Sequence, residues 1–380
     1  MLTKIYHYHH NIWQSKQDLD QVDNKVNLVL CFAAKHHLSK PTIYPAIKEK
    51  FANATIVMSS TAGEIYHDEV MDDSVVLAAI QFQHTAINAH AVSIKNYENS
   101  FDGGQALGKL FKPQGLRYIL LLSDGSLVNG SELLKGISST INKKVLITGG
   151  LAGDAANFSS TLVGLNAAPE EGLITAIGFY GEHLQVMHGS QGGWDIFGLE
   201  KTVTKASSNI LHEIDGQNAL ILYKKYLGTE AANLPGSALL FPLSVIVPGT
   251  DKPVVRTILS VNENENSMTF AGDIPVGSKV RFMKANFNKI TEAAAIAATY
   301  TQQNSKASPS FALLISCVGR KLILGNKIAD EVKAVKETYG KNTLLAGFYS
   351  YGEISPFNEG GSCQLHNQTM TITSFYENKI

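Results

Sequence analysis

The side chains best suited to binding a ligand are concentrated near the carboxyl end of the chain, in and around the segment GFYSYGEI. A guanidinium can form a forked pair with a carboxylate, and a glutamate can accept an ammonium group, so this set predicts a site for a small zwitterion. Tyrosines add apolar faces with hydroxyl groups, and glycines let the backbone approach a ligand closely. The candidate ligand-binding residues are Arg320, Gly347, Tyr349, Tyr351, Glu353, His366 and Asn367.

The same residue types also have a structural interpretation. Arg320 ends the apolar run FALLISCVGR, and it could pair with Glu353 simply to close a sheet. Tyr349 and Tyr351 alternate along a predicted strand, where aromatic side chains often cover the sheet. The residues alone leave both interpretations open.

A repeated order of elements predicts how these residues are brought together. Three times, an apolar run is followed by a helical stretch, a second run that ends in glycine and an acid, and a third apolar run. The glycine-acid pairs are Gly63-Glu64, Gly153-Asp154 and Gly352-Glu353. Because they fall at corresponding places, the sequence predicts tandem repeats whose strand ends converge on a binding site.

We therefore predict an α/β fold of layered sheets covered by helices, built from tandem strand-helix-strand-helix-strand-strand repeats in two domains. In the third repeat, the lead-in strand and helix are predicted to be SKVRFMKAN and ITEAAAIAATYTQQ. An insertion of about one repeat precedes them, and its neck TEAANLPGSALLFP predicts a domain junction near residue 235. The predicted domains are 1–235, with repeats at roughly 1–88 and 86–182 plus part of the insertion, and 236–380, with the third repeat at roughly 278–380.

The amino-acid composition is typical of a globular protein. The chain has 380 residues, of which 44% are hydrophobic and 17% charged, and its formal net charge is −1, the balance of a globular protein. Lys and Arg are scattered singly, so we expect no nucleic-acid partner, and no apolar stretch is long enough to predict membrane insertion. Cys31, Cys317 and Cys363 form no CxxC pair. Reduced thiols and the lack of a leader-like start predict a cytoplasmic location.

Several long motifs resemble the signatures of the FIST sensory family, in its amino-terminal and carboxyl-terminal halves together. They occur in the family's order and cover nearly the whole chain: GGLAGDAANF, VTKASSNILHEIDGQNALILYKKYLG, SCVGR, GFYSYGEI and CQLHNQT. The resemblance implies a bacterial sensor that binds a small ligand and is linked to histidine kinases, cyclic-di-GMP enzymes or chemoreceptors.

Within that family, strings such as GGWDIFG, LLFPL and FAGDIP look closest to the stand-alone nitric-oxide-sensing proteins. This closer resemblance implies bound haem b, sensing of nitric oxide, and regulation of a partner histidine kinase in trans through a two-component system. The alternative partner is a cyclic-di-GMP signalling protein. The alternative ligand is an amino acid or similar metabolite bound without haem, and the candidate set around Arg320 could equally bind a haem propionate.

Haem iron needs an axial ligand, and the chain offers twelve histidines. His366 lies in the strong CQLHNQT motif, and His188 ends a predicted strand just before the glycine-rich turn GSQGGW, where space for a flat ligand could open. These two are the candidate metal ligands, ahead of His183 and His212. In the same turn, Trp194 is predicted either to form a wall of the pocket or to serve as a packing anchor.

We expect binding rather than catalysis. The segment SDGS lacks the context of a GxSxG nucleophile, and no Ser-His-Asp or Cys-His order can be assigned along the chain. Glu64, Asp154 and Glu353 could include a catalytic carboxylate pair, but their repeat positions explain them equally well as turn or cap residues. The sequence thus predicts a sensor that is not an enzyme.

Overall fold

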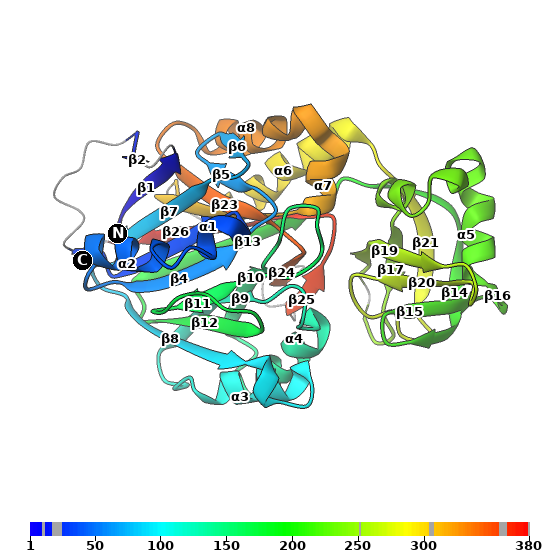
Figure 1. The fold of residues 1–380 in the computed structure, drawn as a ribbon, viewed down its shortest axis with the longest axis horizontal. Coiled ribbons are helices and arrows are strands. Elements are labelled where there is room, and N and C mark those ends of the chain that lie inside the picture. Colours follow the sequence, from blue (N-terminus) through cyan, green and yellow to red (C-terminus); the bar gives the residue numbers. More distant parts are fainter. Residues whose placement is uncertain (10–11, 17–24, 251, 304–307, 357–362, 379–380) are drawn as a thin grey trace.

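The computed structural model describes residues 1–9, 12–16, 25–250, 252–303, 308–356 and 363–378 (Figure 1). It confirms the α/β class. Three six-stranded sheets form a large body, and an eight-stranded sheet forms a smaller lobe beside it. Among the described residues, no helix has the length and apolar character needed to cross a membrane.

Four strands of each unit follow one order in all three sheets of the body, consistent with the repeats. The first is β11 (Val163–Leu165), β4 (Thr55–Ser60), β3 (Leu28–Ala33), β7 (Val75–Gln81), β1 (Leu2–His9) and β2 (Ile12–Gln14). The second is β25 (Cys363–His366), β24 (Gly352–Pro356), β10 (Leu146–Leu151), β9 (Leu116–Ser123), β12 (Leu173–Tyr180) and β8 (Ala86–Ser93). The third is β6 (Glu69–Met71), β5 (Glu64–Tyr66), β23 (Leu344–Ser350), β22 (Phe311–Cys317), β26 (Met370–Glu377) and β13 (Leu184–Gln191).

Each sheet has a parallel pair at its centre, β3 with β4, β9 with β10, and β22 with β23. Their apolar runs lack alternation because helices cover one face and the shared core covers the other, and every residue of β3 and β22 is buried. The helices of the three units are α1 (Lys35–Leu38) and α2 (Ile43–Lys50), then α3 (Ser100–Lys109) and α4 (Gly130–Ser138), then α6 (Phe287–Gln302), α7 (Val318–Leu324) and α8 (Ile328–Tyr339). Short 3-10 turns lie at Ile94–Asn96 (η2) and Gly325–Lys327 (η5).

A segment that begins at or after each glycine-acid pair leaves its own sheet and pairs with the sheet of another unit. In the first unit β5 pairs with β23 of the third, in the third unit β24 pairs with β10 of the second, and in the second unit β11 pairs with β4 of the first. This cyclic exchange links all three units. The repeat pattern in the sequence does not reveal it.

A buried carboxyl fastens two of these hairpins. Glu64 accepts hydrogen bonds from the Thr61 hydroxyl and from the backbone and hydroxyl of Ser74, 3.1 and 2.7 Å away, where β7 begins. In the third unit, Glu353 accepts corresponding bonds from Ser350 and from Thr369, where β26 begins. The two acids therefore connect each hairpin to the last strand of its own unit.

The third unit begins earlier than predicted. Its lead-in strand is β13, which pairs with β26 just as β1 pairs with β7 and β8 with β12. The predicted lead-in strand at 279–284 is β21 (Lys279–Lys284), which instead pairs with β14 (Asp195–Ser207) and β17 (Leu243–Ile246) in the lobe. The predicted start of the third unit was wrong because the insertion interrupts this unit between its first strand and its first helix.

The inserted subdomain, residues 195–284, has its own core and sheet (Figure 1). Besides β14, β17 and β21, it contains β15 (Ile210–Ile214), β16 (Gln217–Asn218), α5 (Ala219–Leu227), η3 (Gly228–Asn233), η4 (Gly236–Leu240), β18 (Val254–Arg256), β19 (Ile258–Asn262) and β20 (Ser267–Phe270). Strands on both sides of residue 235 join the same sheet. The junction predicted there falls inside this subdomain rather than between two domains.

The alanine-rich face of α6 packs closely against the third sheet. Ala294, Ala297 and Ala298 are buried. A Cβ atom at Gly189 of β13 would lie only 2.1 Å from the carbonyl oxygen of Ala297, so this contact requires glycine on the strand. Small side chains on both elements bring the helix backbone directly onto β13.

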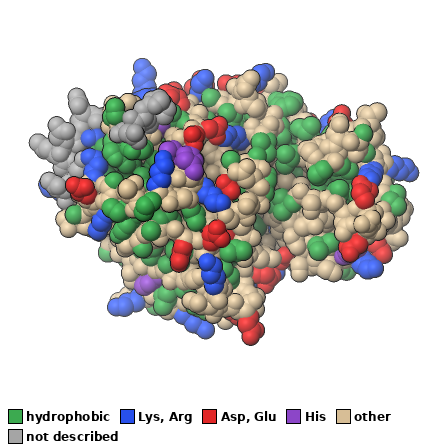
Figure 2. Space-filling model, in the orientation of Figure 1, with side chains coloured by type: hydrophobic (Ala, Val, Ile, Leu, Met, Phe, Trp, Pro, Cys, Tyr) green, Lys and Arg blue, Asp and Glu red, His purple; other side chains and the backbone are tan. Residues whose placement is uncertain are grey.

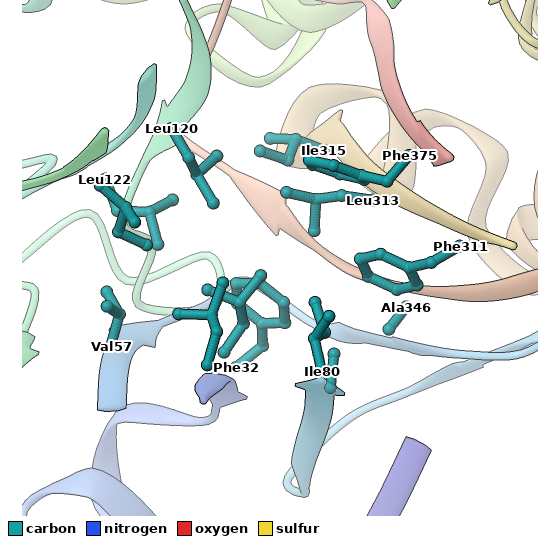
Figure 3. Packing of buried hydrophobic residues seen from close by; sticks show 14 of the residues in the cluster. Phe32, Val57, Ile80, Leu120, Leu122, Phe311, Leu313, Ile315, Ala346 and Phe375 are labelled. Carbon is teal, nitrogen blue, oxygen red and sulfur yellow. The ribbon is translucent and has the colours of Figure 1, made fainter. Parts of the chain in front are cut away.

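The inner faces of the three sheets meet in one apolar core (Figure 3). It includes Phe32 of the first unit, Leu120 of the second, and Phe311 and Phe348 of the third, all with exposures of 1% or less. The rings of Phe32 and Phe348 stack with centroids 4.8 Å apart. Apolar burial between units, together with the exchanged hairpins, makes the body a single folding unit.

We predict that Phe348→Ala lowers the free energy of unfolding by about 3–5 kcal/mol, because it removes a ring from the fully packed core. Chemical denaturation measures this loss. Phe287→Ala is the matched control, since that ring is 50% exposed at the start of α6, and it should cost less than about 1 kcal/mol. Similar losses for the two variants would contradict a shared core.

Glu64 generates a pH-dependent prediction. Burial raises its pKa to about 7, although the bonds from Thr61 and Ser74 oppose the rise. The folded chain therefore keeps a proton that the unfolded chain loses near pH 4.5, so this contribution to stability is present below that pH and is lost as pH rises through 7. Glu64→Gln should match the parent protein near pH 5 and be more stable at pH 8, with a divergence of at most about 1.4 kcal/mol per pH unit.

Denaturant titrations at pH 5, 6.5 and 8 measure that divergence. Glu69→Gln is the control, because the Glu69 side chain is 53% exposed and pairs with Lys16 at the surface. It should show no comparable pH dependence. A constant difference between Glu64→Gln and the parent at all three pH values would refute the buried, protonated Glu64.

Candidate functional site

A cavity of about 1060 Å³ lies where the third sheet, the second sheet and the inserted subdomain meet. Strand β13 supplies one wall, and His366 and Thr369 supply another. Lys252, Pro253, Val255 and Met283 reach it from the subdomain. The insertion therefore builds one side of the cavity.

Both predicted metal ligands line this one cavity. His188 comes from β13 and is partly buried, whereas His366 ends β25 and is 1% exposed. The two are far apart in sequence, and the insertion separates them. Both alternatives for the axial ligand therefore reach the same cavity.

The chemistry of His366 suits a neutral ligand nitrogen. Its Nε2 lies 2.9 Å from the carbonyl oxygen of Ser355, which can only accept, so Nε2 carries the proton and Nδ1 is the basic nitrogen. Burial lowers the pKa of His366 to about 4, the Ser355 contact opposes that change, and Arg256 and His188 lower the pKa further. The imidazole is thus uncharged at neutral pH with its tautomer fixed.

The rest of the lining combines apolar, sulfur-containing and basic groups. The apolar and aromatic members include Leu184, Val186, Met187, Trp194, Val255, Met283 and Tyr300. The basic members are Arg117, Lys143, Lys144 and Lys252. Trp194 thus forms a wall of the pocket, one of its two predicted roles. The basic residues and the methionines were not anticipated, because they come from the second unit, β13 and the subdomain, and no motif marks that meeting.

The face drawn in Figure 2 carries no broad field of one sign. Lys and Arg side chains intermingle there with Asp and Glu over both the body and the lobe. The grouping of four basic side chains around one cavity therefore contrasts with the mixed charge on that face.

Arg256 connects the subdomain to the cavity. Its side chain is buried, and it donates from Nη1 to the carbonyl oxygen of Leu365, 2.8 Å away, in the residue next to His366. Its Nε donates to the carbonyl oxygen of Asp273, whose carboxylate in turn accepts from Asn129 and Lys135 of the body. These contacts fix the lobe against β25 and α4.

Arg320 has different partners from those the sequence suggested. It is fully buried at the start of α7, and its Nε and Nη2 donate to one carboxylate oxygen of Glu331, at 3.0 and 2.7 Å. It also donates to the carbonyl oxygens of Gly192 and Ile290, at 2.6 and 2.7 Å. Its ion-pair partner is therefore Glu331 of α8 rather than Glu353, and its other bonds join the chain segments on either side of the subdomain.

Glu353 lies across the β24–β25 pair from His366. Burial raises its pKa to about 8, with the bonds from Ser350 and Thr369 opposing the rise. Because those residues occupy both of its oxygens, its observed role is to connect β24 with β26. It does not line the cavity.

The other predicted ligand-binding residues make contacts within the fold and do not line the cavity. Tyr349 is fully buried and donates to Glu331 at 2.8 Å. Tyr351 stacks on Phe158 with centroids 4.8 Å apart, and its hydroxyl accepts from the Phe158 backbone. A Cβ at Gly347 would lie 1.8 Å from the carbonyl oxygen of Leu314, so this glycine permits close pairing of β22 and β23. Asn367 follows His366 and is fully buried.

The other histidines considered from sequence lie elsewhere. His183 packs its ring against His84, 5.1 Å away, and His212 lies on β15 of the subdomain. Among the described residues, one group has the spacing of a metal site, namely His36, His37 and Asp73, and two of its three members are exposed. That group lies outside the cavity.

These features define a class of protein: an α/β body of three exchanged units with a ligand-sized cavity at its junction with an inserted subdomain. Comparison with protein families then identifies the chain, which matches the FIST N domain over residues 27–217 and the FIST C domain over residues 219–356. The chain belongs to the FIST family, whose domains are sensors of small ligands. The boundary between the two matches falls inside the inserted subdomain, between β16 and α5.

Other comparisons add little. No curated protein matches the chain. Among solved structures, a cyanuric acid hydrolase from A. caulinodans aligns with 10% identity and a TM-score of 0.19, over 78% of this chain and 100% of that one. A likeness this low carries no argument about fold or activity.

We predict that Arg320→Met lowers the free energy of unfolding by about 3–5 kcal/mol, because it leaves the Glu331 carboxylate buried without its cation. The double variant Arg320→Met/Glu331→Met should recover much of this loss, since no charge is then left unpaired. Lys224→Met, in an exposed pair with Glu263, should cost less than about 1 kcal/mol. Equal stability of the parent and the single Arg320 variant would show that the pair is not structural.

Proposed function

We propose that this protein is a haem-dependent sensor of nitric oxide and that haem b binds in the cavity between β13, β25 and the inserted subdomain. The observation that carries the proposal is the presence of His188 and His366 in the lining of one cavity. Haem bound there would supply an iron atom able to coordinate a diatomic gas. The proposal assigns the axial ligand to one of these two histidines.

The residues present fit the chemistry of haem. A neutral imidazole with its second nitrogen bonded to a carbonyl is a common metal ligand, and His366 has that arrangement. Trp194 and Met283 offer an apolar surface for a macrocycle, while Arg117, Lys143, Lys144 and Lys252 offer partners for two propionates. The predicted role of Arg320 as a propionate partner has no comparable support, because its donors are already bonded to protein acceptors.

The cavity's position also favours a signalling role. Because Arg256 bonds to the residue beside His366, a displacement of β25 on ligand binding would be transmitted directly to the subdomain. We propose that the resulting change in the lobe is recognised by a cytoplasmic partner in trans, a histidine kinase in preference to a cyclic-di-GMP signalling protein. The proposed output is binding and release of that partner, without catalysis.

The competing proposal is a sensor of an amino acid or similar metabolite that binds without haem. Its original basis was a clamp formed by Arg320 and Glu353. Both groups are engaged by internal partners, so the basic lining of the cavity is the better candidate for a carboxylate. The haem proposal is preferred because it gives a cavity histidine the role of iron ligand and the basic lining the role of propionate partners.

The absorption spectrum tests the proposal. Protein prepared with haem should show a stoichiometric Soret band that shifts when the reduced sample is exposed to nitric oxide. Alanine at His188 or at His366 should weaken haem retention at least about tenfold, according to which one is the ligand. Because His366 stays neutral well below pH 7, retention through it should be constant between pH 6 and pH 8.

His212→Ala is the matched control, because that histidine lies on β15 outside the cavity lining, and its spectrum should equal that of the parent. Protein that stays colourless after haemin titration and desalting would refute the haem proposal. The metabolite sensor would then become the preferred function.

A further inference from the structure

Strand β13 has an open edge that faces the cavity. It is the last strand of the third sheet and pairs with β26 on one side, and among the described strands none pairs with its other side. Every residue from Leu184 to Trp194 lines the cavity, so the cavity runs along the whole strand. At about 3.3 Å per residue, the eight residues of β13 span roughly 26 Å.

The register of the third sheet shows which backbone groups of β13 point away from β26. In an antiparallel pair, residues that bond to the partner strand alternate with residues whose N–H and C=O point the other way. The backbone N–H of Asn378 donates to the carbonyl oxygen of His183, so the odd-numbered residues of β13 bond to β26. The N–H of Cys317 donates to Thr369 on the opposite side of β26, which gives the same alternation. The outward-pointing residues that line the cavity include Leu184, Val186 and Ser190.

The cavity wall continues from β13 to the layers on both sides of the third sheet. On the side of α6 the lining includes Tyr300 and Gln303, and on the side of the second sheet it includes Tyr118 and Leu146. The side chains of a strand added to β13 would alternate between these two walls, as they do in any β-strand. Both walls include an aromatic ring, so they suit apolar side chains on the added strand.

The charge of the lining favours an acidic ligand. Among the described lining residues four are basic and none is acidic. Arg117 lies where β13 begins, since it pairs with the exposed Glu182 just before the strand. Lys252 reaches the cavity from the subdomain, close in sequence to Val255, which packs in the same cluster as Trp194 beyond the other end of β13. Basic groups are therefore available towards both ends of the open edge.

We propose that β13 binds an extended, acidic peptide segment of another protein, which adds to the third sheet as a further strand. Backbone bonds to the outward groups of β13 supply the affinity, and the two walls and the basic side chains supply the specificity. An open sheet edge is a ready template for such pairing. Peptide and haem would fill the same volume, so the peptide is tested on haem-free protein, and either proposal can fail without the other.

Synthetic peptides test the strand addition. The probe is an acetylated and amidated octapeptide with two Glu residues at each end and alternating Val and Thr between them, and the fluorescence anisotropy of a labelled copy measures its affinity for the full chain. N-methylation of every second residue removes the hydrogen-bond donors from one edge of the peptide. Of the two complementary N-methylated forms, one should lose at least about tenfold in affinity, and the other should bind nearly as well as the parent peptide. Equal affinities of the two forms, or no saturable binding of the parent peptide, would overturn the proposal.

Variants of the protein locate the site. Val186→Pro removes one outward N–H of β13 and leaves the bonds to β26 in place, so it should weaken binding of the octapeptide at least about tenfold. Val186→Ala keeps that N–H and should lose clearly less affinity. Lys144→Glu should also weaken binding, whereas Lys205→Glu, in an exposed pair of the lobe outside the lining, should not. Unchanged binding by folded Val186→Pro protein means that the peptide binds elsewhere, and the proposal fails. If that variant does not fold, the two N-methylated peptides decide.

Discussion

The buried pair between Arg320 and Glu331 is the interaction on which the arrangement of the cavity depends. Arg320 bonds to the carbonyl oxygen of Gly192, just before the inserted subdomain, and to that of Ile290, just after it. Glu331 also accepts from Ser316 and Tyr349, so its charge is fully compensated inside the body. One ion pair thus fixes both ends of an insertion that would otherwise be joined to the body by two chain segments alone. Without that fixed neck, the subdomain could not supply a reproducible wall to the cavity.

The body provides the matching rigid surface. Each unit gives its hairpin to a neighbouring sheet, so no sheet is completed by its own unit, and the common core lies between all three. Such an arrangement has few independent movements, because displacing one hairpin disturbs two units at once. Any displacement on ligand binding would therefore act on the polar contacts that Arg256 and Asp273 make between lobe and body, rather than within the body.

The sequence predicted the fold class and the repeat because both are encoded locally, in apolar runs, helical stripes and glycine-acid pairs. It also selected His188 and His366 as alternative axial ligands, although nothing in the sequence indicates that both reach one cavity. It did not predict that β13 begins the third unit, since the 95 residues between β13 and α6 hide the connection. Nor could it identify Glu331 as the partner of Arg320, because an acid on the exposed-looking helix IADEVKAVKETYG carries no mark of burial.

The repeat symmetry also clarifies which acids are candidates for function. Glu64 and Glu353 sit at corresponding places and make corresponding bonds to the start of the last strand, so symmetry assigns both to the scaffold. In the second unit Asp124 makes the bond to that strand instead, at Gly172, and Asp154 is left to contact Lys35. An acid that makes the same bonds in two units serves the shared fold. Residues involved in ligand binding are therefore expected among the features that only one unit has. By that criterion the third unit stands apart, since it alone has the insertion and the two cavity histidines.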